Sequence, residues 1–158
     1  MGTHSEKAAE LFMQGYNCSQ AVVGAFCEEL GMDFETAIKL VSPLGGGMGR
    51  LREVCGAVSG MFLLTGMVYG YNEPGNLEIK GELYKRVQEL AKRFKAKHNT
   101  IICRELLEGV EASDAPEPSA RTAEYYQKRP CLKIIKDAAQ IFEEYLSEQN
   151  AQNPTEKL

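Results

Sequence analysis

The stretch VCGAVSGMFLLTGMVYGY, residues 54–71, decides the fold because it contains eighteen residues and no charged side chain. A helix of that length could span a bilayer. Four glycines, a serine, a threonine and a cysteine lower its hydrophobicity, and the sequence on either side is amphipathic. We therefore predict a central helix, starting near Glu53, that other helices bury on all sides and that does not insert into a membrane.

The rest of the chain shows the apolar spacing of amphipathic helices, and no alternating pattern of useful length indicates a strand. Typical N-cap residues, Asn17, Asp33 and Asn76 among them, and proline or glycine stops divide it into separate helices. We predict an all-α fold, a single-domain helical bundle of about six to seven helices over residues 1–150. Residues 151–158 are predicted to form a flexible polar tail, with fraying from Ser147 onward.

The composition limits the classes of function. The 158 residues include 44% hydrophobic and 25% charged side chains, and the formal net charge is −4. Nucleic-acid binding requires a clustered basic surface, so we expect no nucleic-acid partner. The first twelve residues lack the apolar segment of a signal peptide, and we expect a cytoplasmic protein. Cytoplasmic thiols are kept reduced, so the five cysteines indicate reactivity or metal binding rather than structural disulfides.

Four of the five cysteines are expected near a helix N-terminus, where unpaired amide groups favour a thiolate over a thiol. These are Cys18, Cys55, Cys103 and Cys131. Basic residues precede or surround three of them, and Arg50 and Arg52 before Cys55 make Cys55 the expected nucleophile.

Cys27 differs from the other four cysteines. It lies nine residues after Cys18, on the opposite side of the same predicted helix, so the two should not pair. Glu28 and Glu29 follow it and oppose its ionisation. We interpret Cys27 as a packing residue.

The glycines around Cys55 suggest close approach. Gly56 and Gly60 share one helix face and would let another backbone or another sulfur come near. The segment GGGMGR, residues 45–50, could present amide groups to an anion or a cofactor. The candidate cofactor-binding residues are Gly46, Gly47, Gly49, Arg50 and Gly56. The segment matches neither the phosphate-loop nor the dinucleotide pattern.

Several other chemistries lack their motifs. The chain has no CxxC pair, no CxxCH for covalent haem attachment and no HExxH. His4 and His98 are not expected to bind a metal, and Tyr125 and Tyr126 are expected to pack rather than stack on a ligand.

The pattern of cysteines resembles a family of redox-active proteins named for a C…CGAxxG…C…C signature. The match consists of Cys18, CGAVSG at residues 55–60, Cys103 in CRELL and Cys131 in RPCLK, and it spans about residues 16–142. The resemblance implies four characteristic cysteines and a redox role, without a defined substrate. Cys27 is not one of the four signature positions.

Three functions follow as hypotheses. In the first, the cysteines carry out thiol–disulfide exchange or electron transfer with a redox partner protein or a small oxidant. In the second, the same four cysteines, Cys18, Cys55, Cys103 and Cys131, ligate an iron–sulfur cluster or zinc. In the third, the protein is a non-catalytic helical module, in one form a homodimer, that docks onto a redox or transport partner. All but the third require the four sulfurs to meet in space.

Overall fold

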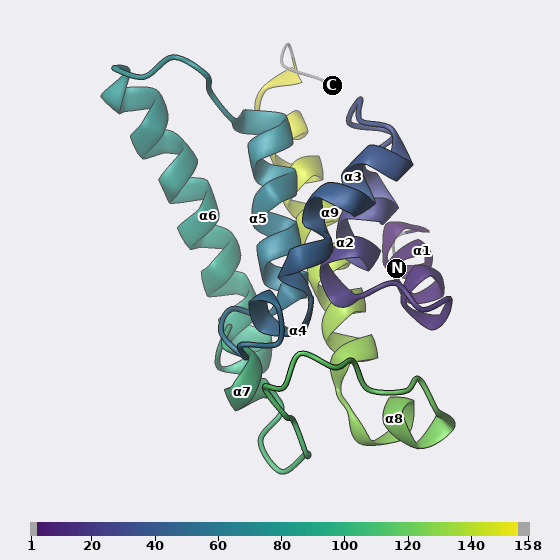
Figure 1. The fold of residues 1–158 in the computed structure, drawn as a ribbon. Helices are drawn as coiled ribbons and strands as arrows, with labels where there is room; N and C mark the ends of the chain where they lie inside the picture. Colours follow the sequence, from purple (N-terminus) through teal and green to yellow (C-terminus); the bar gives the residue numbers. More distant parts are fainter. Residues whose placement is uncertain (1–2, 155–158) are drawn as a thin grey trace.

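The uncharged stretch forms helix α5, Gly56–Tyr69, at the centre of a helical bundle in the computed structural model, which describes residues 3–154 (Figure 1). Helices α2, α6 and α9 pack against α5. In the described part of the chain, no helix is both long and apolar enough to cross a membrane. The prediction of an all-α fold with a glycine-containing central helix is confirmed. The helix is buried on all sides only over residues 56–61, because Leu63 and Gly66 are exposed.

Six helices among residues 3–154 are eight residues or longer, and α4, α7 and α8 are shorter; α8 was not predicted from the sequence. Their bounds are α1 Thr3–Met13, α2 Cys18–Phe26, α3 Phe34–Val41, α4 Gly45–Met48, α5 Gly56–Tyr69, α6 Leu77–His98, α7 Cys103–Leu106, α8 Ala123–Lys128 and α9 Cys131–Gln152, with a 3₁₀ turn at Ser42–Leu44.

The predicted caps define the helix starts. Asn17 accepts a hydrogen bond from the Gln20 amide at the start of α2, and the Gln20 side chain accepts one from the Asn17 amide, which completes a capping box. Asp33 and Asn76 cap α3 and α6 in the same way through their side chains. These local bonds explain why the boundaries of α3 and α6 could be read from sequence.

Four local predictions are wrong. Helix α5 begins three residues after Glu53, because the preceding backbone pairs with residues 101–104 instead. Cys103 begins α7 instead of lying a turn inside it. The glycines of GGGMGR suggest an open loop, but the segment forms a tight turn with left-handed backbone over residues 46–50. Helix α9 does not fray after Ser147 but continues to Gln152, so the predicted tail begins as helix, and residues 155–158 lie outside the described part.

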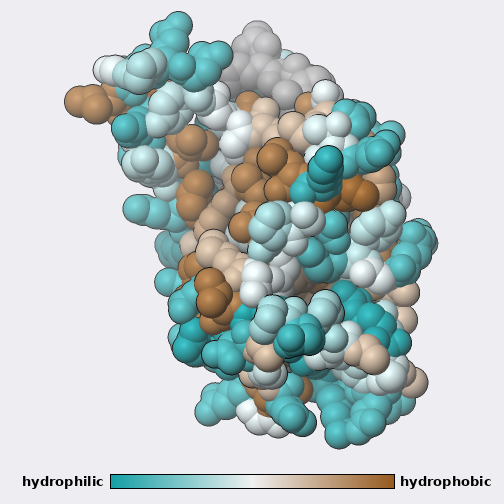
Figure 2. All heavy atoms as spheres, viewed as in Figure 1, coloured by the Kyte–Doolittle hydropathy of each residue, from teal (hydrophilic) through white to brown (hydrophobic). Residues whose placement is uncertain are grey.

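The core consists of apolar side chains from α1, α2, α5, α6 and α9, including the fully buried Phe26, Leu64, Phe94 and Phe142. Hydrophobic side chains also gather near the middle of the face seen in Figure 2, over the region of α3 and α5. Leu40 of α3 and Leu63 of α5 are exposed apolar residues of these helices.

The short elements α4, α7 and α8 gather at one end of the bundle, where α5 and α9 also begin (Figure 1). The isolated antiparallel bridge between Val54 and Ile102 lies at this end. It is extended by hydrogen bonds from the Cys55 amide to the Ile101 carbonyl, 2.8 Å, and from the Cys103 amide to the Glu53 carbonyl, 2.6 Å. The bridge therefore fixes two signature cysteines relative to each other.

Candidate functional site

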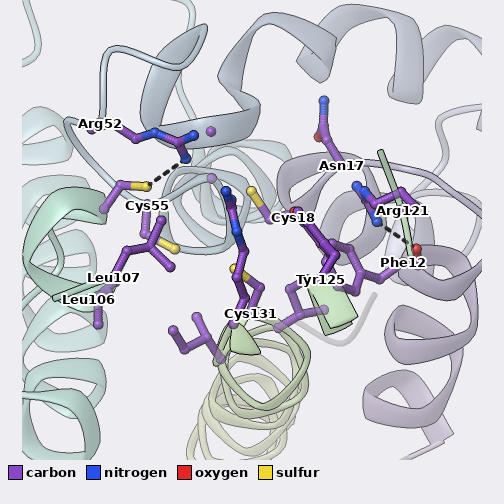
Figure 3. Close-up of a pocket in the computed structure, with 16 residues that line it drawn as sticks. Phe12, Asn17, Cys18, Arg52, Cys55, Leu106, Leu107, Arg121, Tyr125 and Cys131 are labelled. Carbon is purple, nitrogen blue, oxygen red and sulfur yellow. Dashed lines mark hydrogen bonds between the residues drawn. The ribbon is translucent and has the colours of Figure 1, made fainter. Parts of the chain in front are cut away.

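Cys18, Cys55, Cys103 and Cys131 all line one cavity of about 70 Å³ (Figure 3). Its wall is otherwise mainly apolar and aromatic, with three arginines. The remaining lining residues are Phe12, Asn17, Gly46, Arg52, Gly56, Leu106, Leu107, Arg121, Tyr125, Arg129, Ile134 and Ile135. Residues separated by up to 113 positions in the chain are thus brought to a common space, which is the convergence that the leading hypotheses require.

Each of these cysteines stands at the start of a helix. Cys18, Cys103 and Cys131 are the first residues of α2, α7 and α9, and Cys55 is the N-cap residue of α5. The expectation that four cysteines lie near helix N-termini is therefore met. All four are free thiols; Cys55 and Cys103 are buried, and Cys18 and Cys131 are partly exposed.

Glycine allows the cysteine-bearing elements to approach one another. A Cβ atom on Gly56 would overlap the sulfur of Cys18 and lie 2.9 Å from the Leu44 carbonyl oxygen. A Cβ atom on Gly60 would lie 3.2 Å from the carbonyl oxygen of Ser19 in α2. The predicted close approach at Gly56 and Gly60 therefore involves both another sulfur and another backbone.

The glycine segment before α5 packs against a second cysteine. A Cβ atom on Gly47 would lie 2.6 Å from the Cβ atom of Cys103 and 2.8 Å from the Cα atom of Arg52. Gly47 also has a φ of +69°, a conformation that glycine adopts without steric cost. Cys103 and Arg52 therefore occupy the space beside the α-carbon of Gly47, and no ligand can bind there.

The other predicted cofactor-binding residues are divided between two neighbouring cavities. Gly46 and Gly56 line the cysteine cavity, and the Gly46 amide faces the sulfur of Cys18. Gly49 and Arg50 line the adjoining cavity of about 280 Å³, which Gly46 also lines.

Left-handed backbone is concentrated in the segment that leads into Cys55. Besides glycines, Met48, Arg50 and Arg52 have φ values of +68°, +67° and +61°. Such values are uncommon for residues with a Cβ atom. They turn the chain tightly enough for the Arg50, Arg52 and Glu53 amides to bond the carbonyl oxygens of residues 45–47.

Burial opposes thiolate formation at three of the four cysteines. Desolvation raises the pKa of Cys18 and raises that of Cys55 well above its ordinary value, while it raises the pKa of Cys131 to about 12. The expectation that the helix N-termini lower the pKa of these thiols is wrong, because the net shift of each pKa is upward. Amide groups do act the predicted way, those of Ala57 and Val58 on Cys55 among them, but desolvation outweighs them.

The thiols also oppose each other's ionisation, because a negative charge on one disfavours a second nearby. Cys18 raises the pKa values of Cys55 and Cys131, and Cys103 raises that of Cys18. Cys131 likewise raises the pKa of Cys55, and Cys103 raises that of Cys131. Cys18 and Cys131 therefore each interact with all three other sulfurs, and Figure 3 shows Cys18 facing the same space as Cys55 and Cys131.

The arginines are distributed differently from the prediction. Arg52 donates a hydrogen bond from Nη1 to the sulfur of Cys103 at 3.7 Å, and not to Cys55. The dashed line at Arg52 in Figure 3 marks this bond. Arg50 donates to the carbonyl oxygen of Ser113 at 3.2 Å. The argument that these two arginines make Cys55 the nucleophile is therefore wrong, because the tight turn directs both side chains away from it.

Of the basic residues near Cys103 and Cys131 in the sequence, only some interact with the cysteines. Arg104 bonds backbone carbonyl oxygens and pairs with Glu53. Lys128 and Lys133 pair with carboxylates of their own helices. Arg129 does lower the pKa of Cys131, although desolvation and Cys18 prevail.

Sequence reasoning missed Arg121 as a residue of the site. Its guanidinium donates to the carbonyl oxygens of Phe12 and Tyr16, each at 3.1 Å, and lies 5.2 Å from the ring centre of Tyr125. Arg129 lies 4.6 Å from the same ring centre. Tyr125 therefore packs, as expected, and its ring also contacts two cations at the cavity. Because Arg121 precedes α8, no helical spacing in the sequence indicated this contact.

Cys27 lies apart from the cavity, as its opposite-face position suggested. It is fully buried, its thiol donates weakly to the Gly24 carbonyl oxygen at 3.9 Å, and burial followed by Glu28 raises its pKa.

The four thiols have the donor chemistry of a metal site but not its geometry. Within residues 3–154, no three His, Cys, Asp or Glu side chains are grouped so that they could hold one metal ion.

Comparison with known proteins identifies the family. Neither the curated proteins nor the solved structures contain a match. One family model, described as "Putative redox-active protein (C_GCAxxG_C_C)", matches residues 16–145. That range covers most of the chain and includes the four cysteines that line the cavity. The chain therefore belongs to this family of redox-active proteins with a four-cysteine signature.

Proposed function

We propose that the protein carries out thiol–disulfide exchange in the cavity lined by its four signature cysteines. The observation that carries this proposal is the convergence of four free thiols from four separate elements on one small cavity. Exchange requires at least two thiols that can reach one another and a site where one of them can become a thiolate.

Cys103 is the proposed attacking sulfur. It is the thiol to which the Arg52 guanidinium donates, and a cation beside sulfur stabilises negative charge on it. Arg52 is itself 5% exposed, so its interaction with a charged sulfur is only weakly screened by water.

Cys18 is the proposed resolving thiol because Cys103 is the charged neighbour that most affects its pKa, whereas the pKa of Cys131 depends more on Cys18 and Arg129 than on Cys103. The Cys103 thiolate attacks one sulfur of a partner disulfide, and the partner's S–S bond breaks as the mixed disulfide forms. The Cys18 thiol then loses its proton and attacks the sulfur of Cys103, which releases the second half of the partner. Two protein thiols are oxidised, and the partner disulfide is reduced to two thiols.

The test is to expose the reduced protein to a limited amount of a small disulfide and to map the products by peptide mass spectrometry. We expect an intramolecular bond between Cys103 and Cys18 and an unmodified Cys27. The Cys103→Ser variant should react slowly, and the Cys18→Ser variant should stop at the mixed disulfide. Cys27→Ser is the matched control. Four thiols that all stay free under these conditions would refute the proposal.

A second candidate, ligation of an iron–sulfur cluster or zinc by the same four cysteines, is favoured by the donor set. The observed spacing counts against it, because the four side chains are not grouped as ligands of one ion among the residues described. Metal content and visible absorbance after anaerobic purification distinguish the candidates. A loaded cluster would also protect the four thiols from alkylation, whereas Cys27 is protected by its burial in either case.

A further inference from the structure

The cavity of about 280 Å³ beside the cysteine cavity is unusually basic for an acidic protein. Four arginines and no carboxylate line it, although the chain as a whole has a formal net charge of −4. The arginines are Arg50, Arg52, Arg121 and Arg129.

None of the four guanidinium groups forms an ion pair within the described residues, although the charge of Glu117 acts on Arg50 and opposes the lowering of its pKa. Their hydrogen bonds go to backbone carbonyl oxygens, the sulfur of Cys103 and the Tyr126 hydroxyl. The ion pairs of residues 3–154 include none of these arginines. The acidic side chains of the neighbouring loop, Glu111, Asp114 and Glu117, are exposed and do not line the cavity.

Two of the arginines are held under unfavourable electrostatic conditions. Arg52 is almost completely buried without a carboxylate, and a buried charge is costly unless it is paired. The Nε atom of Arg50 is buried and has no hydrogen-bond partner. Burial, followed by the charges of Arg52 and Arg129, lowers the pKa of Arg50. An anion in the cavity would relieve the repulsion among the guanidinium groups that line it.

The basic cavity adjoins the cysteine cavity, because the two cavities share six lining residues. The shared residues are Asn17, Gly46, Arg52, Arg121, Tyr125 and Arg129. A molecule that places a negative group among the arginines can therefore extend a sulfur toward Cys103 and Cys18.

We infer that the arginine-lined cavity binds the carboxylate groups of a small anionic substrate, and that the disulfide reduced in the neighbouring cavity is carboxylate-bearing. Guanidinium groups recognise carboxylates through paired hydrogen bonds. The inference on the disulfide rests on the proposed function, whereas anion binding does not.

Binding is tested with 2,2′-thiodiacetate, a dicarboxylate thioether that cannot undergo exchange. Calorimetric titration of the reduced protein is expected to show one site, and affinity should fall about tenfold in Arg50→Gln and in Arg129→Gln. Arg129→Lys, which keeps the charge, should lose less. Arg104→Gln is the matched control, since Arg104 lies near the site without lining either cavity.

Three outcomes would overturn the binding inference: no binding of the dicarboxylate, equal binding of its uncharged analogue bis(2-hydroxyethyl) sulfide, or affinities unchanged in both Arg→Gln variants. Circular dichroism establishes that the variants fold, and an Arg50→Gln variant that fails leaves Arg129→Gln to decide.

The substrate class is tested separately by rates. The reduced protein should react at least about tenfold faster with 2,2′-dithiodiacetate than with bis(2-hydroxyethyl) disulfide, and Arg129→Gln should remove the difference. Equal rates would overturn the substrate class alone. Failure to react with either disulfide, with thioether binding intact, would refute the proposed exchange and leave the anion site standing.

Discussion

A methyl group on the α-carbon of Gly56 would occupy the space that the sulfur of Cys18 fills. Helices α2 and α5 thus meet at a glycine and a cysteine, and the signature CGAxxG places one of its glycines against another signature cysteine. The motif is therefore a packing requirement of the cavity as well as a carrier of Cys55.

The first prediction is that Gly56→Ala displaces Cys18 and destabilises the fold. Overpacking a close contact typically costs about 1–3 kcal/mol, and urea unfolding should show a loss of that size in the free energy of unfolding. Gly66→Ala is the matched control, because Gly66 lies in the same helix with no atom within 4 Å of the added methyl group. It should be neutral or stabilising by up to about 1 kcal/mol. Equal effects of the two changes would contradict the packing argument.

The second prediction concerns the contact between Arg52 and Cys103. Replacement of Arg52 by glutamine removes the cation beside the sulfur, so alkylation of Cys103 by neutral iodoacetamide should slow about tenfold at pH 8. Peptide mass spectrometry measures the rate. Arg93→Gln, which removes an arginine that lines neither cavity, keeps the Arg52–Cys103 contact and should leave the rate unchanged, and Cys27 should stay protected in both variants if the fold is intact. An undiminished rate at Cys103 would show that Arg52 does not govern its reactivity.

The third prediction is a loss of stability in alkali. The pKa of Cys131 is about 12 in the folded protein, compared with an ordinary value of 9.0. Between these values the unfolded chain releases the proton and the folded chain retains it, so rising pH favours unfolding. Cys131 contributes full stability below pH 9, and its contribution falls by at most about 1.4 kcal/mol per pH unit above it.

Denaturant unfolding at pH 8 to 11 checks this slope. The Cys131→Ala variant removes one such proton, so its stability should decline less steeply over the same range, whatever its stability at pH 8. Parallel slopes for the two proteins would mean that Cys131 titrates normally in the fold.

The fourth prediction separates the structural and positional roles of Asn17. Loss of its cap should cost about 1 kcal/mol, as should loss of the equivalent cap at Asn76, which lies outside both cavities. Only Asn17→Ala should also change the alkylation rate of Cys18, since it releases the first turn that holds this cysteine. Unfolding curves and alkylation rates of both variants provide the comparison; a changed Cys18 rate in Asn76→Ala would mean that the effect is general loosening.

The sequence predicted those features that depend on local chemistry. The caps at Asn17, Asp33 and Asn76 act through bonds within three residues, and the uncharged stretch could only be buried. The family signature then identified the four cysteines, and the structure brings them to one cavity.

Features that depend on distant partners were not predictable. Helix α5 starts late because Val54 pairs with Ile102, which is 48 residues away. The Arg52 side chain bonds the sulfur of Cys103 rather than that of its neighbour Cys55, because the left-handed backbone at Arg52 turns the side chain toward Cys103. The net pKa shifts were mistaken because helix ends are visible in a sequence, whereas the depth of desolvation is a property of the assembled bundle.

The left-handed conformations of Arg50 and Arg52 place two positive charges at the cavities at the expense of backbone conformational energy. Asparagine or glycine would suit those dihedral angles better, and each misfit costs on the order of 1 kcal/mol. Substituting Gly at either position should therefore relieve the strain in the main chain, but it would remove a guanidinium group from the lining of the cavities. A variant stabilised by replacing the residues with unfavourable dihedral angles would therefore lose the guanidinium groups that face the thiols.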